Sequence, residues 1–346
     1  MSLLIPMTSA QARRIEAPSC LPVVAGRPRA TGVNSNFLFE VAERPRACAL
    51  GAIAAVLVGA VGTAGCSDET SGLGEPPLES LFSIAVIADP HIETVSDHEE
   101  RLIAVIAWLD ENALAEQIEL VLVLGDIGWG AGLERAKQLL DELDMPYLPI
   151  VGDNEIVAGD DQAFDTTYQP QYQLLSDRFD HWRQAPLPVW DPEAGMDSWL
   201  QNLAFDYRGL HFFAVDLCIR GDDTIMGEFG TLHDFDGGSW PWLEDQWSAL
   251  APSRGESIIL LSHIPMFLGA LDGDEMTRVN ALLEPLGEYV YANLAGHLHG
   301  NLEREGAAFD VYVTDATHDD DNTVRLIDVR GNGQRFEYDH RLVVIP

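Results

Sequence analysis

The sequence predicts an α/β protein built around a parallel β-sheet. Short apolar runs rich in Val, Ile and Leu alternate with segments whose apolar residues recur at helical spacing, an order typical of parallel sheets. The clearest run spans residues 120–124 and ends at Gly125-Asp126. With 47% hydrophobic residues among 346, the chain can bury a sizeable core. Asp126 is then a carboxylate at the C-terminal end of a buried strand, where α/β sheets bind their ligands.

The first part of the domain is expected to run strand, helix, strand, helix, strand. These elements are predicted at 82–88, 101–115, 120–124, 133–143 and 147–151. Further strands are predicted at 203–215 with a hairpin at 207–210, at 257–262 and at 289–294, and helices at 242–250 and 280–286. Three closing antiparallel strands are predicted at 309–314, 324–329 and 336–344. Periodicity weakens at 157–202 and 216–241, where we expect lid-like insertions.

The N-terminal residues 1–66 are expected to be an extension that carries an export signal. Arg44 and Arg46 precede an uncharged run over 47–67 with an apolar middle and small residues near its end, as in a secretory signal. Thr63-Ala64-Gly65-Cys66 resembles a lipoprotein cleavage box, which makes Cys66 the expected lipidated residue. The alternative is an N-terminal membrane-spanning helix, because the run is long enough for one. Either way, we expect an exported protein of the cell envelope, on its periplasmic or extracellular face.

A flexible linker is predicted at 67–80, followed by a single domain at 81–346. The linker is polar and rich in Gly and Pro. The chain has 56 acidic and 20 basic residues and a net charge of −36. Because this charge repels phosphate backbones, no nucleic-acid partner is expected. Contact with the membrane is expected only through the N-terminal lipid or signal anchor. The four cysteines form no close-spaced pattern that predicts disulfides or a metal site.

Carboxylates and imidazoles follow several of the predicted strands. In chain order the motifs are Asp89-x-His91, Gly125-Asp126, Gly152-Asp153-Asn154-Glu155, His263 and Gly296-His297-x-His299. Carboxylate oxygens and imidazole nitrogens together suit divalent ions such as Zn, Mn and Fe. Seven ligands are too many for one tetrahedral ion. They suit two ions that share a carboxylate.

Each of these residues also has an ordinary structural explanation. The three strand-end Asp residues could cap the helices that follow them, and His263 could be a core histidine. Glu155 fits a helix cap or a supporting role better than a ligand. His318, followed by three Asp residues, is expected in a solvated loop. For the strand-end set taken together, the order of the motifs favours a metal site over coincidence.

The order of the motifs and their strand context resemble the calcineurin-like metallophosphoesterase family, over residues 83–329. The resemblance implies an αββα sandwich of two sheets flanked by helices, and two divalent or trivalent metal ions (Mn, Fe or Zn). It assigns the ligands by position. Asp89, His91 and His299 would bind the first ion, Asp126 would bridge, and Asp153, His263 and His297 would bind the second.

Two positions depart from the family pattern. The third motif usually reads Gly-Asn-His-Asp or Gly-Asn-His-Glu, whereas here it reads Gly-Asp-Asn-Glu. Asp153 therefore replaces a metal-binding Asn, and Asn154 replaces the His that contacts the substrate phosphate. Asn154 is the expected catalytic residue for positioning phosphate, but an amide cannot act as a general acid. Trp129 stands where purple acid phosphatases carry a metal-binding Tyr, so we expect a centre of the non-purple type.

The expected function is metal-dependent hydrolysis of small phosphate monoesters or diesters, with a hydroxide held between the metals as nucleophile. A second hypothesis is a non-catalytic envelope binding protein that keeps the metals for stability, and the departure at Asn154 keeps this alternative open. A nuclease on the same fold is a third hypothesis, which the strong acidity of the chain disfavours.

Overall fold

The computed structural model describes residues 76–345 apart from 94–95, 222–226, 228 and 321. The predicted export signal with Cys66, and residues 67–75 of the predicted linker, lie outside the described residues. Within the described part, none of the helices combines the length and apolarity needed to cross a membrane.

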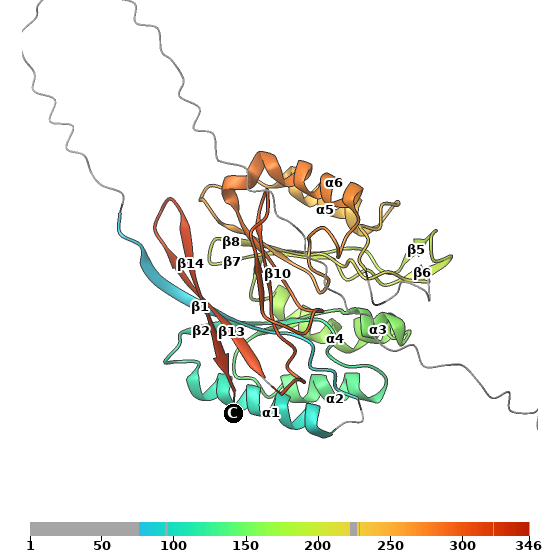
Figure 1. Ribbon diagram of the computed structural model, residues 1–346, viewed down its shortest axis with the longest axis horizontal. Coiled ribbons are helices and arrows are strands. Elements are labelled where there is room, and N and C mark those ends of the chain that lie inside the picture. The colour runs from blue at the N-terminus through green and yellow to red at the C-terminus, as the bar shows by residue number, and fades with distance from the viewer. Residues whose placement is uncertain (1–75, 94–95, 222–226, 228, 321, 346) are drawn as a thin grey trace, which may run out of the picture. The chain divides into compact units, whose positions relative to one another are not determined.

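Two β-sheets pack face to face and helices cover their outer faces (Figure 1). Helices α1 (Ser96–Asn112) and α2 (Ala131–Leu140) lie on the outer side of the first sheet. Helices α5 (Ser239–Ala249) and α6 (Gly273–Leu283) lie on the outer side of the second. A short 3-10 helix, η1 (Glu284–Tyr289), follows α6. This arrangement confirms the αββα sandwich.

The first sheet combines a parallel half with an antiparallel half. Its strand order is β14 (Phe336–Val344), β13 (Thr323–Gly331), β1 (Glu79–Ile87), β2 (Ile118–Leu124) and β3 (Tyr147–Ile150). Strands β1, β2 and β3 are parallel, whereas β13 is antiparallel to both β1 and β14. Most of β1 and β2 is buried, as their continuous apolar runs predict for strands covered on both faces.

The second sheet has the order β11 (Leu302–Arg304), β12 (Asp310–Val313), β10 (Val290–Ala295), β9 (Ile258–Leu261), β8 (Leu210–Ala214), β7 (Leu203–Tyr207) and β4 (Asp180–Gln184). Strands β8, β9, β10 and β12 are parallel. The expectation that residues 309–314 close the fold as an antiparallel strand is therefore wrong for the pairing with β10. The chain reverses twice between β10 and β12, because the short exposed strand β11 intervenes.

Helix α4 (Asp161–Ser176) occupies much of the stretch where a lid-like insertion was expected. It packs against β3: Gln171 Nε2 donates to Tyr147 O at 2.7 Å, and Tyr172 Oη donates to Pro149 O at 3.0 Å. The small hairpin of β5 (Val189–Asp191) and β6 (Met196–Ser198) follows β4. Helix α3 (Asp153–Val157) precedes α4 and begins at the third motif.

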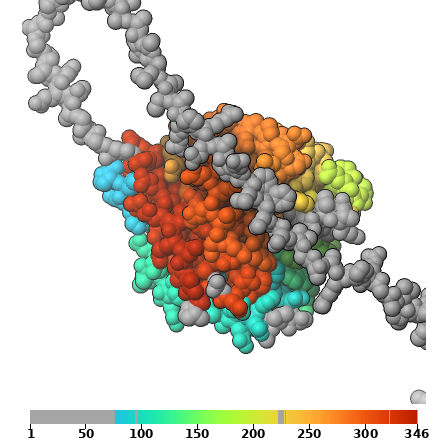
Figure 2. Space-filling view, viewed as in Figure 1, coloured from blue at the N-terminus to red at the C-terminus, as the bar shows by residue number. Residues whose placement is uncertain are grey.

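The hydrophobic core lies between the sheets and beneath the helices, and strands β1, β2, β8, β9 and β10 supply much of it. In the space-filling view the C-terminal strands, coloured red, form a continuous surface beside the blue start of β1 (Figure 2). Cys218, the described cysteine, is buried as a free thiol.

Candidate metal centre

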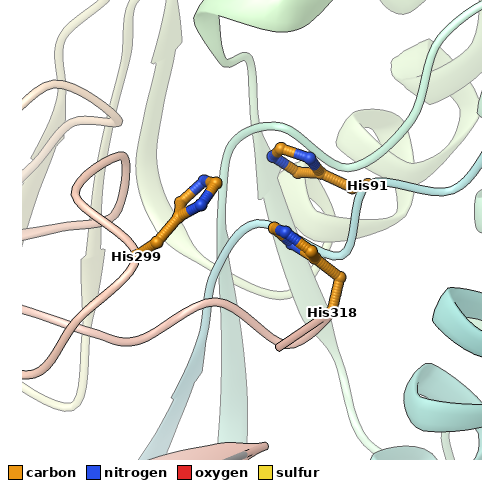
Figure 3. A group of neighbouring side chains, drawn as sticks. All are labelled: His91, His299 and His318. Carbon is orange, nitrogen blue, oxygen red and sulfur yellow. The ribbon is translucent and has the colours of Figure 1, made fainter. Parts of the chain in front are cut away.

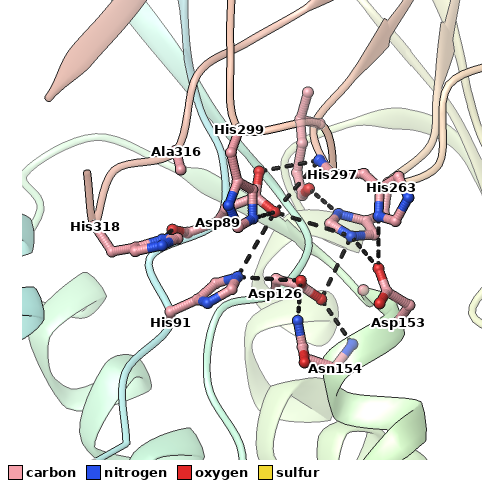
Figure 4. Close-up of polar contacts among 12 residues, drawn as sticks. Asp89, His91, Asp126, Asp153, Asn154, His263, His297, His299, Ala316 and His318 are labelled. Atoms are coloured by element: carbon pink, nitrogen blue, oxygen red, sulfur yellow. Dashed lines mark hydrogen bonds and ion pairs between the residues drawn. The ribbon is translucent and has the colours of Figure 1, made fainter. Parts of the chain in front are cut away.

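The seven predicted ligands come together at the carboxyl ends of the central strands (Figure 4). Asp89 and His91 follow β1, Asp126 follows β2 and Asp153 follows β3, whereas His263 follows β9 and His297 and His299 follow β10. The loops of both sheets therefore contribute to one cluster. Its carboxylates are buried at the base, and His299 is exposed at the rim.

The first group contains Asp89, His91, Asp126 and His299, and each offers one potential ligand atom within 4.8 Å of the others. His91 Nε2 lies 3.2 Å from Asp126 Oδ2 and 3.9 Å from Asp89 Oδ1. His299 Nε2 lies 3.5 Å from Asp89 Oδ1. The backbone holds this group together as well, because His91 N–H donates to Asp126 O at 2.9 Å.

The second group contains Asp153, His263 and His297, again with ligand atoms within 4.8 Å of one another. Asp153 Oδ1 lies 2.7 Å from His263 Nε2 and 2.8 Å from His297 Nδ1. His263 Nδ1 donates to Leu124 O at 2.7 Å, since a carbonyl oxygen can only accept. This bond fixes the ring and directs Nε2 at the carboxylates, as a hydrogen bond to the other ring nitrogen does for metal-binding histidines.

Asp126 lies between the two groups. Its Oδ2 faces His91 of the first group at 3.2 Å, and its Oδ1 faces His263 of the second at 3.4 Å. The backbone N–H of Asn154 donates to Oδ1 at 2.8 Å, and the Asn154 side-chain amide donates to Oδ2. Both oxygens are thus held by one neighbouring residue, in an orientation that lets each serve a different cation.

Five of the seven predicted ligands have a left-handed backbone. The φ angles are 51° at Asp89, 51° at His91, 50° at Asp126, 73° at His297 and 46° at His299. This conformation costs a non-glycine residue about 1–2 kcal/mol, and such residues cluster at functional sites. Their concentration at the strand ends indicates that these positions are shaped for a site at the expense of local stability.

Two glycines allow the loops to approach closely. A Cβ on Gly152 would lie 2.1 Å from Asp126 N and 2.2 Å from Asp126 Oδ1. A Cβ on Gly125, whose φ is 83°, would lie 2.3 Å from His263 Nδ1. Both distances are far below ordinary contact, so these glycines determine where Asp126 and His263 can sit.

The pKa values show that the carboxylates depend on nearby positive charge. Burial disfavours the charge on Asp126, yet His263 and His91 hold its pKa well below the usual range. Burial also opposes the charge on Asp153, but His263 and His297 lower its pKa to about 2. Burial alone would lower the pKa of His263, but Asp126 and Asp153 raise it well above normal. Metal cations would supply the same positive charge, and the nitrogen and oxygen donors suit Zn, Mn or Fe.

Glu155 supports the centre from below. It is fully buried, and its carboxylate accepts hydrogen bonds from Gly128 N at 2.9 Å and Gly152 N at 2.8 Å. It thereby caps α3 and ties the loop after Asp126 to the third motif. Burial and the neighbouring Asp126 charge raise its pKa to about 8. Its contacts are those of the cap expected from the sequence.

His318 also belongs to the cluster, although the sequence placed it in a solvated loop. Its ring stacks on His91 with centroids 4.0 Å apart and planes at 19°, and its Nδ1 donates to Asp89 O at 2.8 Å. Figure 3 shows it facing the same gap as His91 and His299. The bridge between Ala88 and Ala316 places its loop beside the first motif. Only the parallel pairing of β12 reveals this proximity, and no local sequence signal does.

Comparison with known proteins identifies the family. The profile described as calcineurin-like phosphoesterase matches residues 82–301, which is more than half of the chain. The chain belongs to the calcineurin-like phosphoesterase family. No curated protein matches the sequence. As a member of this family the chain is a metal-dependent hydrolase of phosphoester bonds, and its clustered Asp and His residues are suited to metal binding.

Several solved structures are similar to this calcineurin-like phosphoesterase at low sequence identity. A protein described as a 5'-nucleotidase from Staphylococcus aureus has a TM-score of 0.45 and 10% identity, and the match covers 76% of this chain and 54% of that one. GAP50, the anchor in the inner membrane complex of Plasmodium, has a TM-score of 0.42 and 12% identity, with 78% and 90% covered. Phosphopantetheinyl hydrolase from Mycobacterium tuberculosis has a TM-score of 0.39 and 10% identity, with 68% and 90% covered. This chain thus spans about half of the 5'-nucleotidase.

Proposed function

We propose that this calcineurin-like phosphoesterase uses two metal ions to hydrolyse small phosphoesters in the cell envelope. The position of Asp126 carries the proposal, because its two oxygens face histidines of two separate ligand groups. In this assignment Asp89, His91 and His299 would hold one ion, Asp153, His263 and His297 would hold the other, and Asp126 would be available to both. The ions, which would be Mn, Fe or Zn, would supply an activated water nucleophile and neutralise phosphoryl charge.

The chain's own residues would orient the reacting groups. Asn154 holds Asp126 through its backbone and side-chain amides, and its remaining amide hydrogen could still position a phosphoryl oxygen. Glu155 fixes the backbone of the loops that carry Asp126 and Asp153. An Asn cannot protonate a leaving group, so esters with good leaving groups are the expected substrates.

Hydrolysis of 4-nitrophenyl esters by the purified full-length chain tests this function. We expect activity that a chelator abolishes and added Mn restores, together with about two metal ions per chain by elemental analysis. Asp126→Ala should lower both metal content and turnover. The proposal fails if the metal-loaded protein leaves a broad panel of monoesters and diesters intact.

The second candidate function is a non-catalytic binding protein, and the contacts made by Asn154 support this alternative. The Asn154 amide is engaged with Asp126 in the position where the family usually has a phosphate-contacting His. Asn154→His separates the candidates, since it should raise turnover in an enzyme and leave an inert binder unchanged.

Export and lipid anchoring complete the proposal. Thr63-Ala64-Gly65-Cys66 supports them as the expected processing site. Mass spectrometry of the native N-terminus should show a lipid-modified Cys66, and Cys66→Ala should release the protein from membranes.

A further inference from the structure

The centre carries one more negative charge than the family pattern provides. The carboxylates of Asp89, Asp126 and Asp153 all lie within 3.9 Å of His263 Nε2. Two divalent ions would add four positive charges, so the loaded centre would have a formal charge of +1. An Asn at position 153, as the family pattern has, would leave +2. Attraction for an anionic substrate is correspondingly weaker here.

The surroundings of the centre do not restore the missing positive charge. In the described part of the chain, none of the hydrogen bonds and ion pairs made by the seven ligands involves Lys or Arg. Arg101 reaches the rim but donates to the His318 carbonyl and to Asp320. Asp319 adds a further negative charge, with Oδ1 3.5 Å from His318 Nε2. A second charge on the phosphoryl group therefore finds no basic partner among these contacts.

Apolar side chains flank the centre instead. Leu298, between His297 and His299, is 44% exposed, and Val157, one helical turn after Asp153, is 53% exposed. On the side of the first group, the Trp129 ring lies edge-on to His91 with centroids 5.3 Å apart. Apolar side chains therefore adjoin ligands of both groups: Trp129 contacts His91 of the first, whereas Leu298 directly follows His297 and Val157 lies one helical turn after Asp153 of the second. Such surfaces suit organic substituents.

From these observations we propose that the preferred substrates are phosphodiesters rather than phosphomonoesters. A diester has one negative charge and two organic groups, whereas a monoester above pH 7 has close to two charges and one organic group. The diester therefore matches both the low charge of the centre and its two apolar sides. This preference rests on the proposed phosphoesterase function, and Asp153 is the residue that sets it.

The test compares bis(4-nitrophenyl) phosphate with 4-nitrophenyl phosphate at pH 8, using the Mn-loaded full-length chain. We expect a higher kcat/KM for the diester. Asp153→Asn should shift the ratio toward the monoester by about tenfold to a hundredfold, the effect of one unit charge at close range in a partly screened site. Asp319→Asn should shift it the same way by a smaller factor without changing metal content. Asp339→Asn is the matched control, because Asp339 is an exposed acid on β14 that pairs with Arg330.

Binding supplies a readout that does not depend on turnover. Calorimetry should show that Asp153→Asn tightens inorganic phosphate, a dianion at pH 8, more than dimethyl phosphate, a monoanion. If Asp153→Asn loses a metal ion, the Asp319→Asn variant provides the test in its place. It removes a nearby negative charge without changing metal content, so its ratio of diester to monoester activity should still shift toward the monoester. Monoester preference in the wild type, or a ratio unmoved by both variants, overturns the diester assignment while the phosphoesterase function stands. Absence of turnover on both esters overturns the function itself.

Discussion

Gly152→Ala should disable the centre by displacing Asp126. The added Cβ would lie 2.1 Å from Asp126 N, and ordinary contact begins at 3.4 Å, so the two loops must separate by about 1.3 Å. The φ of Gly152 is −113°, a conformation open to any residue, so the effect comes from close approach and not from backbone strain. Misplacing catalytic groups by about 1 Å can cost about 100-fold in rate. Overpacking of this kind costs about 1–3 kcal/mol of stability.

The assay measures three quantities on the same preparations: the dissociation constant for Mn, kcat/KM for an aryl phosphodiester, and the thermal midpoint. We expect Gly152→Ala to weaken metal binding and to lower kcat/KM by about 100-fold, with a fall of only a few degrees in the midpoint. Gly333→Ala is the control, because its Cβ would meet open space. If the two variants had equal metal affinity and turnover, the close approach of Gly152 to Asp126 would have no functional consequence.

Three further predictions concern residues around and away from the centre. His318→Ala should weaken Mn binding by about 10- to 100-fold, because His318 supports His91. The free lone pair of His318, on Nε2, lies in a ring plane nearly parallel to that of the stacked His91, so His318 is placed to pack on His91 and not to share its ion. His318→Phe should therefore retain more affinity than His318→Ala in the same titration, and equal losses would contradict a supporting role. Burial lowers the pKa of His340 to about 4, so the unfolded chain takes up the proton first as the pH falls from 6.5. The free energy of unfolding should therefore decrease from pH 6.5 to 4, and His340→Phe should remove about 2 kcal/mol of that decrease in urea titrations. Arg220→Met should cost about 3–5 kcal/mol in urea unfolding, because it leaves Asp216 buried without its cation, and Asp216→Asn added to it should recover part of the loss.

The central strands of the two sheets could be predicted from the sequence because a strand buried on both faces has a continuous apolar composition. Strand β2 is apolar over five consecutive residues, 120–124, since helices and the second sheet cover its two faces. The motifs were found for the same reason, because each follows such a run. Strand β11 was missed because its three residues are exposed and carry no apolar pattern. Helix α4 was missed because Pro170 and its many polar residues obscure the helical periodicity.

The residues of the candidate site also differ in whether the local sequence predicts them. Strand-end positions could be predicted locally, whereas His318 depends on a long-range pairing. Its loop reaches the first motif because β12 runs parallel to β10, and the segment that follows β12 forms a bridge between Ala316 and Ala88. An antiparallel β12, as the sequence suggested, would have carried His318 to the opposite end of the sheet. The error in strand direction and the omission of His318 therefore have one cause.

The metal centre combines left-handed backbone conformations with buried carboxylates, and each of these features opposes folding. Their occurrence together distinguishes the centre from the rest of the fold. Five left-handed residues at about 1 kcal/mol each amount to roughly 5 kcal/mol, which is comparable to the whole net stability of many domains. Three buried carboxylates add a cost that only nearby positive charge removes. The buried sheets on either side must offset both terms. Bound cations would remove much of the electrostatic one, and binding would then stabilise the fold as well as enable chemistry. Strain and charge at the strand ends would then have the same explanation, because the backbone holds these side chains in positions that bound metal would make favourable.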